Sequence, residues 1–276
     1  MSILIGTVIG FILGLTGAGG SILAVPLLMA GLDWPITQAA TVSLLAVAVA
    51  AAVGALMAWR HSYVRYRTAT FIAVIGVMVA PFGIRVANTL QPSMLIIIFS
   101  IVLGIVAIRM FRSAVIASKE ATIVRATVDG EGEPCSGKIC KLNPLSGRLI
   151  WNWGTLCLLG LVGTATGFLS GLLGVGGGFV IVPALRATTP LSIHSAIATS
   201  LMAIALISTG TVVSGLMEGR SLPLEVALPF VAGTVSGMAL GRVAAPYIAD
   251  HKLQKGFSLL VLAVSMSMMV HALARF

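Results

Sequence analysis

The stretch GFILGLTGAGG at residues 10–20 returns, with changes, as GFLSGLLGVGG at residues 167–177. The two copies lie 157 residues apart in the chain (174 − 17 = 157). The same offset, without any gap, pairs further residues in the two halves: Pro26 with Pro183, Leu28 with Leu185, Ala39 with Ala196, Ser43 with Ser200, Leu44 with Leu201, Gly76 with Gly233, and Arg85 with Arg242. Agreement over this distance indicates that the chain contains two copies of one unit.

The composition predicts that both units lie in a lipid bilayer. Apolar residues make up 58% of the 276 positions and charged residues only 9%, which is outside the range of water-soluble domains. Long uncharged stretches cover residues 1–32, 34–59, 68–84, 86–108 and 149–185. In lipid such stretches are helical, because a helix pairs its own backbone groups within one segment.

We therefore predict an all-α polytopic membrane protein built from two tandem homologous helical repeats. Four apolar segments, bounded largely by proline-containing turns, are expected in each repeat: residues 3–31, 36–58, 68–89 and 93–112, then 150–188, 192–217, 224–246 and 253–274. The first repeat is residues 1–112 and the second is residues 149–276. The polar linker between them, residues 113–148, carries no catalytic motif. Basic residues gather in this linker and at residues 60–67, which predicts a cytoplasmic position for both.

The first segment of each repeat is too long for one straight span and is broken by glycines. Residues 3–31 would form a helix of roughly 44 Å, against a hydrocarbon core of about 30 Å. The two halves of the segment either continue as one kinked span, which gives parallel repeats, or fold back as a re-entrant pair, which gives inverted repeats. The re-entrant fold places slightly more of the basic residues on one face, so the charge distribution favours inverted repeats.

Paired glycine breaks at corresponding positions predict a substrate site. Irregular backbone at membrane depth is tolerated where it lines a cavity or is buried in protein. A helix that starts after such a break presents unpaired N–H groups and the positive end of its dipole, and these groups bind anions. The alternative is that the glycines only let helices pack closely.

Polar groups in the apolar segments extend the predicted site. Hydroxyl groups early in the second segment of each repeat can donate hydrogen bonds to an anion, or can bond a carbonyl one turn back. Arg85 and Arg242 either supply positive potential or snorkel to the headgroups. The predicted substrate-binding residues are Gly17, Gly19, Gly20, Ser43, Arg85, Gly174, Gly176, Gly177, Gly178, Thr199, Ser200 and Arg242.

Other functions find little support in the sequence. The four His and three Cys residues show no spacing typical of a nucleophile with its base or of a metal cluster, so we expect neither an enzyme, nor a metal, nor a cofactor. Cys135 and Cys140 form a lone C-x4-C pair. Carboxylates, including Glu218, lie at segment ends and are expected to be solvated. The net charge of +9 is explained by basic loops against lipid headgroups, so we expect no nucleic acid partner.

The two glycine motifs resemble the sulfite exporter TauE/SafE family of membrane transporters. Each motif is followed by a proline, Pro26 or Pro183, and by a helix rich in small residues, such as Ala196-Ile197-Ala198-Thr199-Ser200-Leu201. The first half departs from this pattern, since Thr41-Val42-Ser43 stands opposite Ala198-Thr199-Ser200. The resemblance implies a multi-pass carrier in the cell inner membrane that moves sulfite, sulfoacetate or other organosulfonates.

The residues predict a carrier of a small anion, and the resemblance implies a secondary transporter that exports small sulfur-containing anions. Two alternatives stay open at this point: an anion channel, and a carrier of another small organic anion such as a carboxylate. The expected partners are a small anionic substrate and the lipid bilayer. The sequence does not determine whether two copies form a homodimer.

Overall fold

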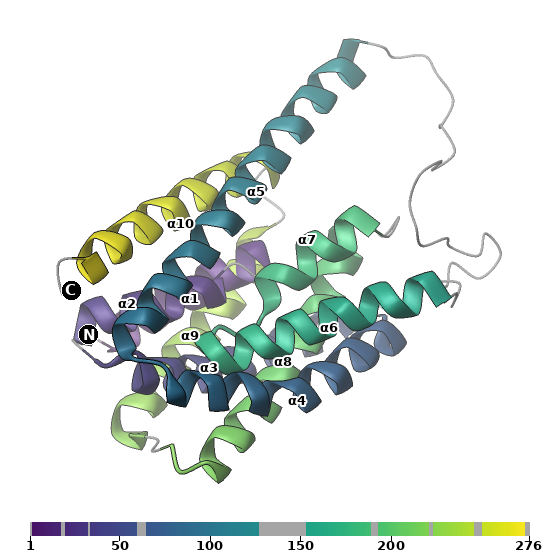
Figure 1. The fold of residues 1–276 in the computed structure, drawn as a ribbon. Coiled ribbons are helices and arrows are strands. Elements are labelled where there is room, and N and C mark those ends of the chain that lie inside the picture. Colours follow the sequence, from purple (N-terminus) through teal and green to yellow (C-terminus); the bar gives the residue numbers. More distant parts are fainter. Residues whose placement is uncertain are drawn as a thin grey trace.

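The structure of the protein is a computed structural model. It describes residues 2–17, 20–32, 34–59, 65–126, 153–188, 193–220, 223–245 and 250–273, and their regular structure is entirely helical. The helices, labelled in Figure 1, are α1 Ser2–Thr16, α2 Gly20–Leu32, α3 Ile36–Trp59, α4 Tyr66–Thr89, α5 Pro92–Ala126, α6 Trp153–Leu173, α7 Gly178–Thr188, α8 Ile193–Met217, α9 Leu224–Ala244 and α10 Asp250–Leu273.

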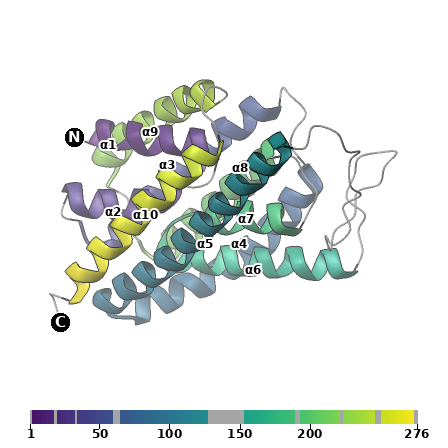
Figure 2. The same cartoon turned by 90° about the horizontal axis from the view of Figure 1, so that it is seen from above.

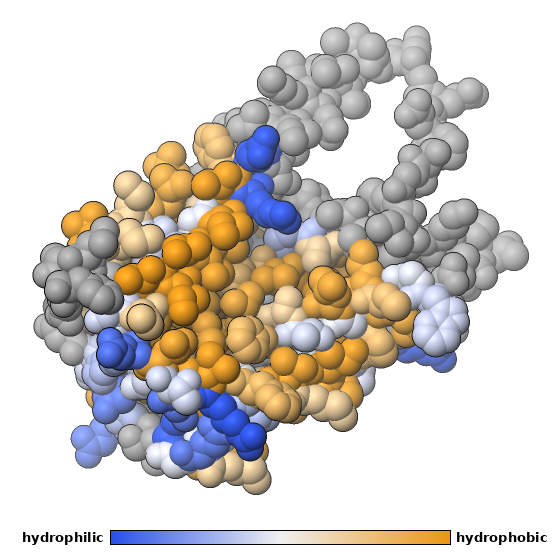
Figure 3. Space-filling view, viewed as in Figure 1, coloured by the Kyte–Doolittle hydropathy of each residue, from blue (hydrophilic) through white to orange (hydrophobic). Residues whose placement is uncertain are grey.

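Six of these helices are long and apolar enough to cross a membrane. They are α3, α4, α5, α6, α8 and α9, while α1, α2 and α10 hold shorter apolar stretches. Large apolar side chains also cover the outside of the bundle, and Leu161 and Met78 are 71% and 69% exposed. In Figure 3 apolar residues form a broad belt, with hydrophilic residues gathered near two opposite edges of that face. An apolar exterior of this extent fits a lipid environment.

The helix boundaries agree with the predicted segments to within a few residues, with one difference. The first segment of each half splits into two helices, α1 with α2 and α6 with α7, at the predicted glycines. The difference concerns α5: its apolar span ends at Arg112, as predicted, but the helix itself continues to Ala126. Residues 113–126 contain neither glycine nor proline, so nothing stops the helix where the apolar stretch ends.

After each break the chain folds back on the helix that precedes it. A methyl group on Gly20 would collide with the backbone of Leu13, and one on Gly31 would lie 2.6 Å from Ile5 Cδ1. The α2 helix therefore runs antiparallel to α1. In the second half, Gly177 similarly lies against Thr166 of α6. The re-entrant alternative thus describes the path of the chain, while the orientation of the two halves across a bilayer stays a prediction.

The two halves are joined by exchanged helix pairs. The first helix of each half packs on the helix that forms the third predicted segment of the other half, so α1 lies on α9 and α6 lies on α4. Glycines make the backbones meet, since a methyl group on Gly10 would collide with the Thr234 carbonyl and one on Gly167 with Gly76. The helices α3 and α8 pack together in the interior, and α5 and α10 form a pair along one side (Figures 1 and 2). Small residues at these positions allow close packing in lipid.

Candidate functional site

The break between α6 and α7 is buried and has a backbone that only glycine adopts easily. The φ angles of Gly174, Gly176 and Gly177 are 73°, 72° and 67°, in the left-handed region that costs other residues free energy. All residues from Gly174 to Gly178 are buried. The sequence therefore needs its glycines here for conformation as well as for close packing.

This break leaves a run of backbone donors unpaired. The Gly174 N–H donates to the Ser170 carbonyl at 2.9 Å, and the Val180 N–H donates to the Gly177 carbonyl at 3.1 Å. Between these two bonds, the N–H groups of residues 175–179 have no backbone acceptor within the described part of the chain. They lie at the start of α7, where the helix dipole is positive. Consecutive donors of this kind form an anion-binding concavity.

Helices α3 and α8 enclose the break from two sides. A methyl group on Gly174 would collide with Ala40 of α3, and one on Gly176 would lie 3.2 Å from Val47 Cγ1 of α3 and 3.5 Å from Ile204 Cγ2 of α8. One helix from each half of the chain therefore contributes to the wall of this site.

Two buried serine hydroxyls in these walls have no hydrogen-bond partner among the described residues. They are Ser43 of α3 and Ser208 of α8, both 0% exposed. Ser208 faces the break directly, because its Oγ would lie 2.6 Å from a methyl group on Gly176. Ser43 lies between Ala40 and Val47 in the sequence at helical spacing, so it shares the α3 face that meets the glycines. A buried hydroxyl without a partner costs free energy, unless a ligand supplies the partner.

The equivalent break between α1 and α2 repeats part of this geometry. Gly17 has a φ of 73°, and a methyl group there would collide with Ile197 of α8. Ile197 is the counterpart of Ala40, which faces Gly174, at the 157-residue offset. Gly19 lies outside the described residues. Ile197 and Ser208 are 11 positions apart on α8, roughly 16 Å along the helix. One anion shared by both breaks stays a prediction.

The other predicted hydroxyls already have partners. Thr199 donates to the Ser195 carbonyl at 2.7 Å and accepts the Arg65 N–H at 3.1 Å, which ties the start of α4 to α8. Ser200 donates to the Ile197 carbonyl at 2.8 Å. Their roles in binding remain predictions, and the geometry assigns them a structural role first.

The remaining predicted residues divide between packing and the ends of helices. Gly20 begins α2 and allows the close contact with α1, whereas Gly178 begins α7 at the break. Arg242 is half-buried on α9 and its backbone lies beside Gly14, near the end of α1. Arg85 is not brought to the glycine breaks. Its side chain is 73% exposed and pairs with Glu218 at 3.5 Å.

Sequence reasoning did not identify Ser208. Its counterpart at the 157-residue offset is Ala51, so a search for residues shared by both halves does not find it. The sequence feature that could have identified it is a serine within a long uncharged helix. This serine lies two helical turns after Leu201, in the helix that is rich in small residues. Glu218, which was expected to be a solvated boundary charge, is exposed after the end of α8, and it also belongs to a polar cluster with residues of α4.

The geometry supplies neutral donors rather than charges. Among the described residues no group of three His, Cys, Asp or Glu side chains is placed to hold a metal, while Cys135 and Cys140 lie outside those residues. Backbone N–H groups and two hydroxyls can replace part of the hydration shell of an anion. Because these groups carry only partial charges, they allow release as well as binding.

Comparison with known proteins places this fold in a family. Residues 2–268 match the model of the sulfite exporter TauE/SafE family. Probable membrane transporter proteins of Xylella fastidiosa, strains 9a5c and Temecula1, are 29% and 31% identical to the chain, each over 94% of this chain and 90% of the relative. A probable membrane transporter protein of Methanocaldococcus jannaschii is 27% identical, over 88% of this chain and 86% of its own. No solved structure matches the chain significantly. The chain therefore belongs to the sulfite exporter TauE/SafE family and is a multi-pass membrane transporter.

Proposed function

We propose that the chain is a secondary transporter that exports small sulfur-containing anions, such as sulfite or organosulfonates, across the inner membrane. One observation carries the proposal: the buried α6–α7 break places free backbone donors beside the unpartnered hydroxyl of Ser208. Donors of this kind suit an oxygen-rich anion.

The balance of binding and release supports a carrier. Hydrogen bonds to a charged group are worth about 1.5–3 kcal/mol each, so a few of them offset part of the desolvation of a small anion. A buried lysine or arginine at the same place would bind the anion more tightly and slow its release. The half-buried Arg242 on α9 instead adds positive potential from a distance.

The charge distribution along the chain supports the orientation. Residues 60–67 and 113–148 hold many of the basic residues, which supports a cytoplasmic position for both under the positive-inside rule. The contact of Arg65 with Thr199 then sets the start of α8 on the same side as the start of α4. The C-terminal ends of α4 and α8 face the outside of the cell.

Uptake into proteoliposomes tests the function. Purified protein is reconstituted and offered radiolabelled sulfite, sulfoacetate, acetate or chloride over a range of concentrations. We expect saturable uptake of sulfite or sulfoacetate that exceeds that of acetate and chloride. Uptake that rises linearly with concentration indicates a channel instead of a carrier, and preference for acetate indicates a carboxylate carrier. Equal uptake by protein-free vesicles would overturn the proposal.

A further inference from the structure

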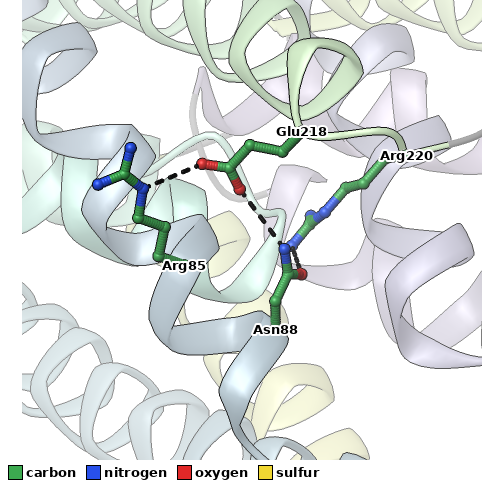
Figure 4. Close-up of polar contacts among 4 residues, drawn as sticks. All are labelled: Arg85, Asn88, Glu218 and Arg220. Carbon is green, nitrogen blue, oxygen red and sulfur yellow. Dashed lines mark hydrogen bonds and ion pairs between the residues drawn. The ribbon is translucent and has the colours of Figure 1, made fainter.

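A cluster of four polar side chains ties the outer ends of α4 and α8 together. Arg85 Nε lies 3.5 Å from Glu218 Oε1, and the Asn88 amide Nδ2 donates to Glu218 Oε2 at 3.4 Å. Arg220 completes the cluster, since its Nη2 donates to Asn88 Oδ1 at 3.0 Å. Figure 4 shows the two α4 side chains reaching toward the two residues that follow α8. The cluster therefore joins one half of the chain to the other, and we call these four residues the clasp.

The turn that carries Glu218 and Arg220 is well defined. The Gly219 N–H donates to the Leu216 carbonyl at 3.1 Å and the Arg220 N–H donates to the Gly215 carbonyl at 3.0 Å. With a φ of 83° at Gly219, these bonds form a Schellman motif at the end of α8. The motif turns the chain so that the side chains before and after Gly219 both reach α4.

The clasp lies between the α6–α7 break and one face of the protein. Glu218 is 10 residues beyond Ser208 on α8, roughly 15 Å along the helix. Gly215 lies between them and is buried, and a methyl group there would touch the Arg220 Cδ at 3.4 Å. The Arg220 side chain thus covers the α8 face that leads from the clasp toward Ser208.

The duplicated sequence does not repeat the clasp at the opposite end. At the 157-residue offset Arg85 corresponds to Arg242, but Asn88 corresponds to Ala245 and Glu218 to His61. Alanine cannot replace the amide, and histidine cannot act as a carboxylate acceptor. The corresponding positions therefore do not carry this set of partners.

We propose that the clasp is a one-sided gate that holds the outer end of the pathway closed and biases the empty transporter toward the state that loads from the cytoplasm. The inference rests on the proposed orientation for its direction, and on the contacts alone for the gate. Exposed polar pairs are individually weak. A weak network suits a gate, because it shifts the ratio of two states by about fivefold to tenfold and still opens in each transport cycle.

Thiol labelling at Gly215 tests the gate without any substrate. Gly215→Cys is introduced into protein in which Cys135, Cys140 and Cys157 are serine, and a membrane-impermeant thiol reagent is added to oriented vesicles on the side of the clasp. We expect Glu218→Gln and Arg85→Gln each to raise the labelling rate about fivefold. The double variant should label no faster than either single one, because both remove the same interaction.

Two outcomes would overturn the gate. The first is a labelling rate that neither single variant changes. The second is an equal increase in the labelling rate of the Glu225→Gln variant. This variant is a matched control, because it loses an exposed carboxylate at the start of α9. Arg85 is 73% exposed, so its replacement leaves the core intact even if Glu218→Gln folds poorly. Because labelling needs no anion, a failure of transport in every assay would leave this result standing.

Discussion

The hydroxyl of Ser208 on α8 points at Gly176, so closely that a methyl group on the glycine would lie 2.6 Å from the serine Oγ. This relationship links the two features that define the candidate site: a left-handed glycine backbone and a buried hydroxyl without a partner. The unpartnered hydroxyl costs free energy in the folded protein. Both are expected where a ligand approaches the backbone closely and replaces water.

The unpartnered hydroxyls lead to a prediction about stability. Ser43→Ala and Ser208→Ala each remove a buried polar group that has no partner, so the unfolding temperature in the absence of substrate should stay the same or rise. Ser170→Ala should lower it, since the Ser170 hydroxyl pairs with Thr211 Oγ1 at 3.2 Å. Thermal unfolding of the three detergent-solubilised variants checks this. A clear destabilisation by Ser208→Ala would show that the hydroxyl already has a structural partner.

Gly176 should not tolerate a side chain. Gly176→Ala places a Cβ on a residue with a φ of 72° and presses it against Ser208, at a cost of about 1–2 kcal/mol in backbone conformation alone. We expect lower thermal stability and loss of substrate binding. Gly256→Ala is the matched control, because no atom lies within 4 Å of the added methyl group and the residue is in helix α10. Equal stability of the two variants would contradict the account of the break.

Gly177 should not tolerate a branched side chain either. It has a φ of 67°, and a Cβ there would lie 2.8 Å from the Thr166 carbonyl oxygen. Branched side chains fit neither condition. We expect a Gly177→Val variant to be destabilised, so its loss of transport would not identify the binding groups.

Packing of α1 on α9 should depend on Gly10. Gly10→Ala forces the helix backbones apart at Thr234, and overpacking of this kind costs about 1–3 kcal/mol. Gly160→Ala on α6 is the control, since its nearest neighbour would be Ile75 Cδ1 at 3.7 Å. We expect the yield and unfolding temperature of Gly10→Ala to fall while those of Gly160→Ala remain near the parent values. Similar behaviour of both variants would argue against a close contact at Gly10.

The predicted topology is accessible to labelling as well. Cys135 and Cys140 belong to the polar linker, residues 113–148, for which the sequence predicts a cytoplasmic position. An impermeant thiol reagent should label them in inverted membrane vesicles and should fail to label them in intact cells. Cys157→Ser protein serves as the background, because Cys157 is exposed on α6. Labelling in intact cells would reverse the orientation and, with it, the direction assigned to the clasp.

Periodicity and composition were sufficient to predict the helices. Uncharged runs and proline-containing turns were enough to predict the segments, because a single apolar segment in lipid must be helical to pair its own backbone groups. The helix α5 continues past the predicted apolar segment because hydropathy marks where a helix leaves the lipid, not where the helix ends. The break at Gly174–Gly177 was visible in the sequence as a cluster of glycines, and the similar motif in the first half led to the prediction that it is more than a packing feature.

The site itself was only partly predictable. Contacts between halves decide which residues meet, and no local pattern reveals that Ser208 on α8 faces a break more than 30 residues earlier in the chain. Likewise, Arg85 was predicted to bind the substrate because it lies at the position that corresponds to Arg242 in the other half. Its actual neighbour, Glu218, is 133 positions away, and such a pairing follows only from the way α4 packs beside α8.

The most direct test of the central claim is uptake of radiolabelled sulfite or sulfoacetate into proteoliposomes by Ser208→Ala protein at matched protein levels. Loss of one hydrogen bond to a charged ligand is worth about 1.5–3 kcal/mol, so the concentration for half-maximal uptake should rise at least tenfold. Ser100→Ala is the control, since that buried hydroxyl on α5 donates to the Ile96 carbonyl at 2.8 Å and should leave uptake unchanged. If Ser208→Ala and the parent protein show the same concentration dependence, the α6–α7 break does not bind the anion, and helix packing alone explains its glycines.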